Sequence, residues 1–210
     1  TNLISITLPS SLDHIGRTGY GDYGVFEGCT NLKSISFPDG ISSIVSATFK
    51  GCTSLTSIAL PESIEYIEWN AFEGCTSLAQ ITLPNETSTI GWDAFEGCDN
   101  LVAITLGADF ESIGYGEGSE DLAEELSELP KLANINVSAE NDDFTSVDGV
   151  LYNEDKSELI AFPAGRTGSF AIPSYVKEIS QDAFSNSRLT SITIPDTVTF
   201  IGEYAFDGAS

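Results

Sequence analysis

Basic residues are scarce in this 210-residue sequence, and their scarcity narrows the classes of partner. Lys and Arg number 8, against 32 Asp and Glu, which gives a formal net charge of −24. The phosphate backbone of a nucleic acid would be repelled by this charge. An anionic membrane surface would be repelled for the same reason. The composition therefore excludes nucleic-acid binding and suits a protein outside a cell or on its surface.

Histidine and long apolar runs are also in short supply. His14 is the one histidine, and no Ser, Cys or carboxylate pair lies near it in a catalytic pattern. No apolar stretch approaches the ~18 residues that cross a bilayer. No basic start precedes an apolar core, as it would in a signal peptide. We therefore predict no catalytic residue, no metal site, no cofactor and no membrane insertion in these residues, and hence no enzyme.

What the sequence does contain is one repeated pattern. Strings of the type LxxIxLP begin at Leu32, Leu55, Leu78 and Leu101, 23 residues apart each time. One unit, residues 55–77, reads LTSIALPESIEYIEWNAFEGCTS. Its alternating SIAL segment predicts a strand with one buried face, and the following proline ends that strand. Because a single coil cannot bury its apolar side alone, neighbouring coils must stack into a solenoid.

Two slots of the repeat predict how the core is filled. One slot holds a phenylalanine in most coils, which predicts a continuous aromatic spine. The other holds a cysteine in four consecutive coils, which predicts buried, reduced thiols. Side chains stacked in parallel keep their Cβ atoms too far apart for a disulfide. The first slot contains Phe26, Phe49, Phe72, Phe95, Phe184 and Phe206, and the second contains Cys29, Cys52, Cys75 and Cys98.

These strings resemble the bacterial surface leucine-rich repeats of the BspA-like class, whose pattern is LxxIxLPxxLxxIGxxAFxxCxx. The resemblance covers nearly the whole chain, and it implies a right-handed, β-rich leucine-rich-repeat solenoid with a concave parallel sheet. It also implies an extracellular or cell-surface protein that binds an extracellular or host protein, as in adhesion. A carbohydrate-binding surface on the same scaffold is the alternative. We expect residues 1–210 to form a single solenoid that is a segment of a longer array.

Two departures from the repeat predict added elements. A hairpin insertion at about 138–168 resembles one that often interrupts this class, with strands at 150–152 and 159–162. Residues 119–130 place Leu122, Leu126 and Leu129 at helical spacing, which predicts a short helix on the convex side. The acidic loops 117–125 and 140–149 are expected to be solvated, with calcium binding as the alternative.

Candidate ligand-binding residues come from one outward slot. Trp69, Trp92 and Tyr115 each lie two residues after an isoleucine in three consecutive coils, and Tyr66 lies close by in the sequence. An exposed row of rings would stack sugars or anchor a protein partner. The alternative is that each ring lies flat over its neighbour and shields the coil edge. The concave strands present small, uncharged residues, so we expect a weak ligand or none on that face.

Overall fold

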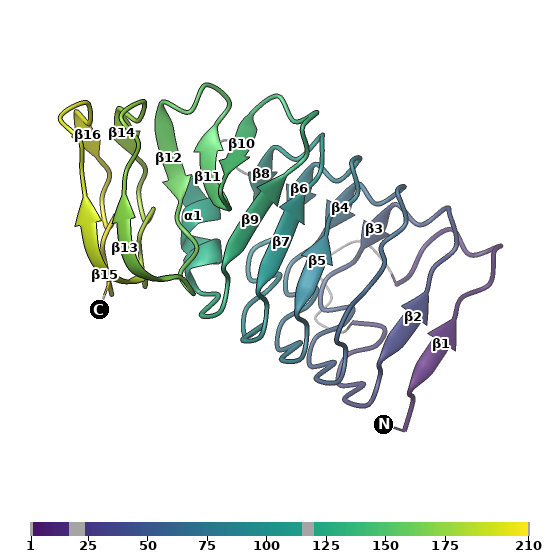
Figure 1. The fold of residues 1–210 in the computed structure, drawn as a ribbon. Coiled ribbons are helices and arrows are strands. Elements are labelled where there is room, and N and C mark those ends of the chain that lie inside the picture. Colours follow the sequence, from purple (N-terminus) through teal and green to yellow (C-terminus); the bar gives the residue numbers. More distant parts are fainter. Residues whose placement is uncertain (1, 17–23, 115–119, 210) are drawn as a thin grey trace.

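The chain forms a series of coils that stack side by side from one end to the other (Figure 1). The computed structural model describes residues 2–16, 24–114 and 120–209. Strands of successive coils pair in parallel, with isoleucine opposite isoleucine, as in the pairs Ile81–Ile104 and Ile104–Ile135. The predicted solenoid with parallel sheets is therefore confirmed.

One row of strands forms the concave face, which is turned to the viewer in Figure 1. It is divided into three sheets, β1–β2, β5–β7–β9 and β13–β15. Residues 57–59, where the repeat predicts another strand, form no regular strand and separate the first two sheets. The strands are β1 (Ser5–Thr7), β2 (Ser34–Ser36), β5 (Gln80–Thr82), β7 (Ala103–Leu106), β9 (Asn134–Val137), β13 (Thr167–Ala171) and β15 (Arg188–Thr193).

A second row of short strands lies across the core from the first. Its inward residue is again an isoleucine, such as Ile44, Ile67 or Ile90, and each of these is buried. These strands also pair in parallel from coil to coil. They are β3 (Ser43–Ile44), β4 (Tyr66–Ile67), β6 (Thr89–Ile90), β8 (Ser112–Ile113), β14 (Glu178–Ile179) and β16 (Phe200–Ile201).

The AFxGC turns are joined to one another by backbone hydrogen bonds. Phe49 N–H donates to the carbonyl of Ala71 in the next coil, and Phe72 N–H donates to Ala94, both at 2.8 Å. The same bond recurs near the C-terminus, from Phe184 to Ala205 at 2.8 Å. The same hydrogen bond therefore recurs when the turn is translated by one coil.

The phenylalanine slot forms two stacks, so the predicted continuous spine is wrong. The first stack runs from Phe26 to Phe95, with neighbouring ring centroids 5.4–5.6 Å apart and nearly parallel rings. The second joins Phe162, Phe184 and Phe206 at 5.2 and 5.3 Å. The stacks belong to separate buried clusters. The coil between them has no AFxGC turn, and a helix fills the same volume.

The cysteine slot forms the expected ladder of buried, free thiols. The Cys52 and Cys75 S–H groups donate to the carbonyls of Phe26 and Phe49, each 3.2 Å away in the preceding coil. The Cys98 S–H makes the equivalent bond to Phe72 at 3.3 Å. Burial raises the pKa of Cys52 and of Cys98 to about 12. The thiols of Cys52, Cys75 and Cys98 therefore donate weak hydrogen bonds in the core, and they are not poised as nucleophiles.

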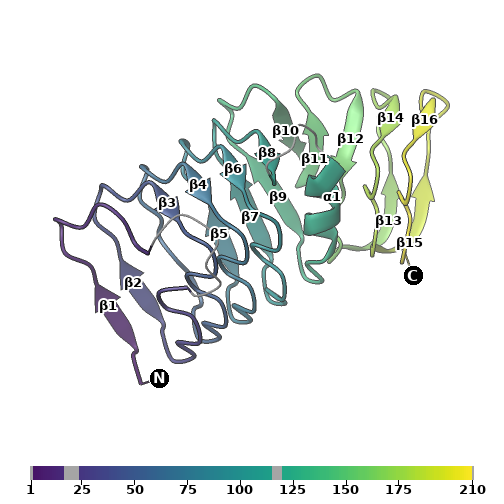
Figure 2. The same cartoon turned by 180° about the vertical axis from the view of Figure 1, so that it is seen from behind.

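The predicted helix is present as α1 (Glu120–Ser127), on the side opposite the concave strands (Figure 2). Its predicted apolar residues Leu122 and Leu126, and Leu129 just beyond it, are buried. Residue 119, the first residue of the predicted helical segment, lies outside the described residues. The helix thus supplies the apolar groups that the missing turn would have supplied.

The insertion contains one strand more than the two that we predicted from the sequence. The two expected strands are β11 (Val150–Asn153) and β12 (Glu158–Ala161), which pair antiparallel. The additional strand, β10 (Phe144–Val147), pairs with β11 across a two-residue turn, Asp148–Gly149. Both turn residues have positive φ, 50° and 76°. An Asp-Gly pair is a strong signal for such a tight hairpin turn.

A left-handed backbone residue precedes the Ala-Phe pair in several coils. Asn70, Asp93 and Asp182 have φ between 54° and 56°, a region that Asn and Asp tolerate well. Ala47 and Tyr204 occupy the same slot with φ values of 55° and 54°. Residues other than Gly, Asn and Asp lose about 1–2 kcal/mol in this conformation. These two coils therefore carry backbone strain that the others avoid.

The thiol ladder predicts a large difference in reactivity between the folded and the unfolded protein. With Ellman's reagent at pH 8, the native protein should react very slowly, because all four thiols are buried. After unfolding in guanidinium chloride, four thiols per chain should be titrated. Recovery of fewer than four from freshly purified protein, or rapid native reaction of all four, would contradict the ladder.

The strained slot predicts that Tyr204→Asn stabilises the protein. The Tyr204 side chain is 65% exposed, so little packing is lost on substitution. Relief of the left-handed strain should add about 1 kcal/mol to the free energy of unfolding, or about 2–4 °C in Tm. Tyr204→Phe is the matched control, because it keeps the strain, and its Tm should stay unchanged. An equal rise in both variants, or none in Tyr204→Asn, would count against this explanation.

Candidate functional site

Two of the predicted rings are in contact. Trp69 and Trp92 stack with their ring centroids 6.0 Å apart and an interplanar angle of 16°. Trp69 is half-buried, whereas Trp92 in the following coil is 47% exposed. The pair therefore presents one large aromatic surface to solvent on a rigid stack of coils.

The two rings also lie across glycines of the following coils. A Cβ atom added to Gly91 would lie 2.5 Å from Trp69 Cδ1, and one added to Gly114 would lie 2.7 Å from Trp92 Cε2. Real Cβ atoms do not approach other atoms so closely, so each ring needs a glycine beside it. The rings thus pack against the edges of the following coils, while Trp92 stays partly exposed.

The other two candidate residues differ in what the structure says of them. Tyr66 is the outward residue of β4, is 45% exposed, and pairs with Ser43 and Thr89 in the neighbouring strands. It is thus a large ring among small neighbours. Tyr115 lies outside the described residues. A ligand at Tyr66, Trp69, Trp92 or Tyr115 stays a prediction.

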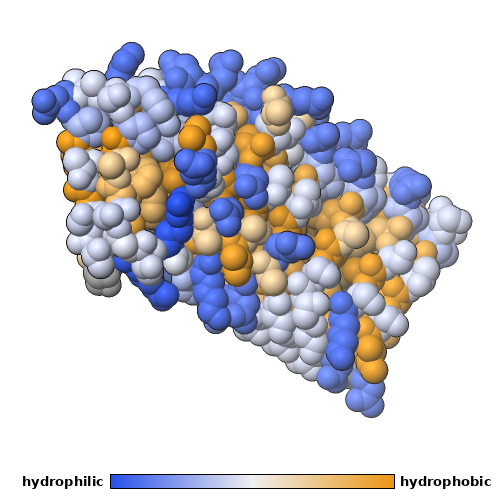
Figure 3. Space-filling model, in the orientation of Figure 1, coloured by the Kyte–Doolittle hydropathy of each residue, from blue (hydrophilic) through white to orange (hydrophobic). Residues whose placement is uncertain are grey.

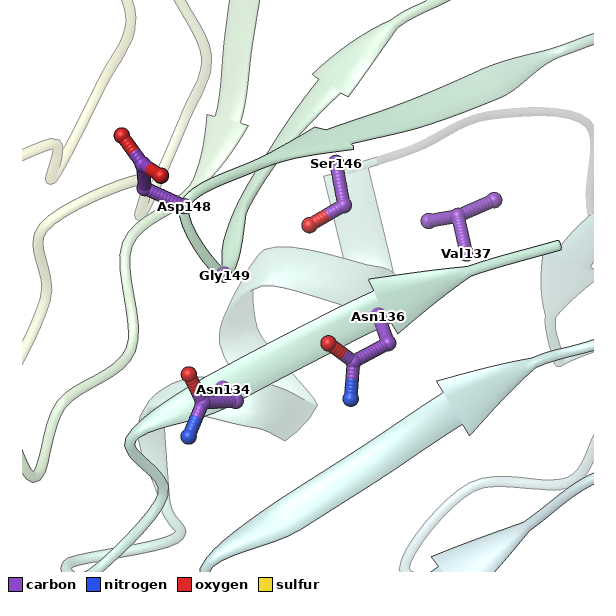
Figure 4. Close-up of a pocket in the computed structure, with 6 residues that line it drawn as sticks. All are labelled: Asn134, Asn136, Val137, Ser146, Asp148 and Gly149. Carbon is purple, nitrogen blue, oxygen red and sulfur yellow. The ribbon is translucent and has the colours of Figure 1, made fainter. Parts of the chain in front are cut away.

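A polar hollow on the concave face is a second candidate site. It was not predicted from the sequence. It is shallow and open, has a volume of about 530 Å³, and lies between β9 and the β10–β11 hairpin. Figure 4 shows Asn134 and Asn136 on β9, Ser146 on the facing strand, and Asp148 at the turn with its carboxylate directed away from β9. Val137 and Gly149 complete the lining. Across the wider face, Figure 3 shows apolar and pale surface interrupted by hydrophilic side chains in the middle, and more hydrophilic side chains along the upper edge.

Two hydrogen bonds join the hairpin to β9, and a third holds the backbone of its turn. Ile135 N–H donates to the Gly149 carbonyl at 3.0 Å, and Ser146 Oγ donates to the Ile135 carbonyl at 2.5 Å. Arg166 Nη1 donates to the Asp148 carbonyl at 2.8 Å. A side chain at residue 149 would lie 2.8 Å from Asn134 Oδ1, so only glycine permits this approach. The Asp-Gly pair and the two asparagines, where other coils have mainly Ser, Thr or Ala, were the available sequence signals.

Glu125 of α1 has a perturbed pKa, which is often the mark of a catalytic group. Its two carboxylate oxygens accept hydrogen bonds from Asp93 N–H at 3.1 Å and Phe95 N–H at 3.3 Å. In regular coils the equivalent N–H groups donate to backbone carbonyls of the next coil. Burial raises the pKa of Glu125 to about 7. Both oxygens of Glu125 accept bonds from backbone N–H groups, as carbonyls of the next coil do elsewhere. Glu125 therefore has a structural role.

His14, the one histidine of the sequence, is exposed and contacts the neighbouring Asp13. In the part of the chain that the structure describes, no three His, Cys, Asp or Glu side chains are grouped to hold a metal ion. Within the same residues, no helix has the length and apolar character needed to cross a bilayer.

Coils with a repeated Leu, Ile and Phe core, joined by parallel strands, define the leucine-rich-repeat class of solenoid. Residues 1–117 and 160–210 match the BspA type leucine-rich repeat region, in six copies. The chain belongs to this BspA type leucine-rich repeat family. The residues outside the match contain α1 and the β10–β11 hairpin. A comparison with curated proteins gave no match.

Solved structures with the same fold are bacterial leucine-rich repeat proteins. One from Eubacterium ventriosum is 23% identical, with a TM-score of 0.67 over 99% of this chain and 57% of its own. The pneumococcal vaccine antigen PcpA is 22% identical, with a TM-score of 0.66 over 99% of this chain and 59% of its own. A leucine-rich cell surface protein from Faecalibacterium prausnitzii is 25% identical, with a TM-score of 0.60 over 95% and 57%. The chain thus spans less than two thirds of each.

The raised pKa of Glu125 predicts a specific pH dependence of stability. The folded protein holds the Glu125 proton more tightly than the unfolded chain does. The contribution of this group to the free energy of unfolding should therefore fall as pH rises from about 4.5 to about 7, and stay constant above. Glu125→Gln resembles the protonated side chain and removes this loss.

Urea unfolding at pH 5 and pH 8 checks this expectation. Between the two pH values, wild-type protein should lose roughly 1–3 kcal/mol more than Glu125→Gln, since one pKa unit corresponds to about 1.4 kcal/mol. Glu124→Gln is the matched control, because Glu124 is exposed on the same helix, and it should follow the wild type. Equal pH dependence in all three proteins would show that Glu125 is not buried in its protonated form.

Proposed function

We propose that this chain is a non-catalytic protein-interaction module of a secreted or cell-surface protein. The observation that carries the proposal is the stacked pair Trp69–Trp92, whose outer ring is 47% exposed, with Tyr66 also exposed on the adjacent strand row. Tryptophan and tyrosine are enriched among the residues that anchor protein interfaces. Because the rings stand on stacked coils, little conformational entropy is lost when a partner orders them.

Charge and similarity support the location and the class of partner. A net charge of −24 disfavours nucleic acids and anionic membranes as partners. One similar structure is described as a cell surface protein and another as a vaccine antigen. An extracellular protein, such as a surface protein of a host, is therefore the proposed partner, and adhesion the proposed role. Residues 1–210 are proposed to act as one interaction unit.

Substitution of the outer tryptophan tests the proposal. A panel of purified extracellular-matrix proteins is passed over the immobilised chain in a surface plasmon resonance measurement. Trp92→Ser should weaken binding of the recognised partner by at least tenfold, as expected for an interface anchor, and should lower Tm by only about 2–4 °C, because the ring is about half exposed. Tyr204→Ser is the control, since this exposed ring lies in another coil, and it should bind as the wild type does.

Three results would argue against the proposal. Binding that persists in Trp92→Ser together with a lower Tm would show that the ring is structural only. Equal losses in both variants would indicate that the partner does not select this surface. Failure to bind any protein of the panel, with retention of oligosaccharides on a glycan array, would favour the carbohydrate alternative.

A further inference from the structure

The regular pairing of concave strands stops at β9. On its N-terminal side β9 pairs with β7, with Asn134 opposite Ala103 and Asn136 opposite Thr105. On the other side the next sheet begins only at β13, and the β10–β11 hairpin occupies the intervening position. The hollow described above lies at this break. Since Ala103 and Thr105 are small, they leave the two carboxamides open to solvent.

The groups that face into the hollow are polar but uncharged. Asn134 and Asn136 are both exposed, and each carboxamide can donate and accept hydrogen bonds. Ser146 Oγ already donates to the Ile135 carbonyl, so its oxygen can accept from a ligand. The Asp148 carboxylate lies at the rim and is directed outward (Figure 4). The hollow therefore combines donors and acceptors without a fixed charge on its floor.

We propose that this hollow is a binding site for a neutral saccharide. Sugar hydroxyls both donate and accept, which matches two carboxamides and one accepting hydroxyl oxygen. An anionic ligand would meet the carboxylate rim and the strongly negative chain. An ammonium or guanidinium ligand would leave the carboxamide N–H groups without acceptors. The volume of about 530 Å³ is within the ~300–1,000 Å³ of small-ligand sites.

The walls of the site are fixed before a ligand arrives. The hairpin is fastened to β9 through Ile135 and Ser146, and Arg166 holds the backbone of its turn. Asn134 and Asn136 stand on a strand that is paired with β7 along its whole length. A preorganised site loses less conformational entropy on binding. This site is independent of the tryptophan surface, and its test separates the two.

A printed array of neutral oligosaccharides, built from glucose, galactose, mannose and N-acetylglucosamine, serves as the probe for the full chain. The strongest saccharide is then titrated calorimetrically against the variants. Asn136→Ala should weaken its binding about tenfold, the effect of losing a carboxamide's hydrogen bonds. Gln80→Ala removes an exposed carboxamide from the concave strand β5, outside the hollow, and should change the affinity less than twofold. All variants should keep the wild-type Tm.

Two further variants define the ligand and the surface. Asp148→Asn keeps a residue that tolerates the left-handed turn and removes the rim charge, so affinity should change less than threefold. Affinity should also be the same in 0.05 M and 0.5 M NaCl, since a neutral ligand has no charge to screen. Trp92→Ser should bind the saccharide as the wild type does, even if it no longer binds a protein partner.

Each contrary outcome overturns the proposal in a different way. If no neutral saccharide is retained on the array, the hollow is not a saccharide site. If binding survives Asn136→Ala, or is lost in Trp92→Ser alone, the sugar binds elsewhere. A loss of tenfold or more in Asp148→Asn would show that the rim carboxylate, and not the two carboxamides, holds the saccharide.

Discussion

The backbone hydrogen bonds between consecutive AFxGC turns are the interaction on which the rest of the structure depends. Each joins an N–H of one coil to a carbonyl of the next at 2.7–3.1 Å, in pairs such as Phe49–Ala71 and Asn70–Trp92. They fix the translation between coils, and with it the ring stacks, the thiol ladder and the left-handed slot. Where the following turn is missing, Glu125 supplies the acceptors for Asp93 and Phe95. The N–H groups of the last regular turn therefore have hydrogen-bond acceptors even though no AFxGC turn follows it.

The parts of the fold that could be predicted are those that the repeat itself determines. Identical spacing places Phe49 beside Phe72, and Cys52 beside Cys75, without any knowledge of longer-range contacts. The helix was predictable because its leucines recur at helical spacing, and the β11–β12 turn because its polar residues interrupt two apolar runs. In each case the evidence is local in the sequence.

The parts that could not be predicted arise where the translation fails. The aromatic spine is divided because the coil between the two stacks has no AFxGC turn, and the buried leucines of α1 join the core instead. The hollow depends on how closely the hairpin approaches β9, a contact between residues more than ten positions apart. The packing of Trp69 over Gly91 joins slots of different coils. Such features depend on tertiary contacts. The repeat therefore indicated the tryptophan residues but neither their packing nor the hollow.

Amide hydrogen exchange of the native protein, followed by NMR, tests the central claim that the turn-to-turn bonds hold the solenoid together. At pH 6 the amides of Phe49, Phe72 and Phe184 should be among the slowest to exchange, because they open only when the coils separate. Phe95, whose N–H is bonded to Glu125, should be protected in the wild type and less protected in Glu125→Ala. Fast exchange at Phe49 and Phe72, beside slow exchange in the concave strands, would contradict the account.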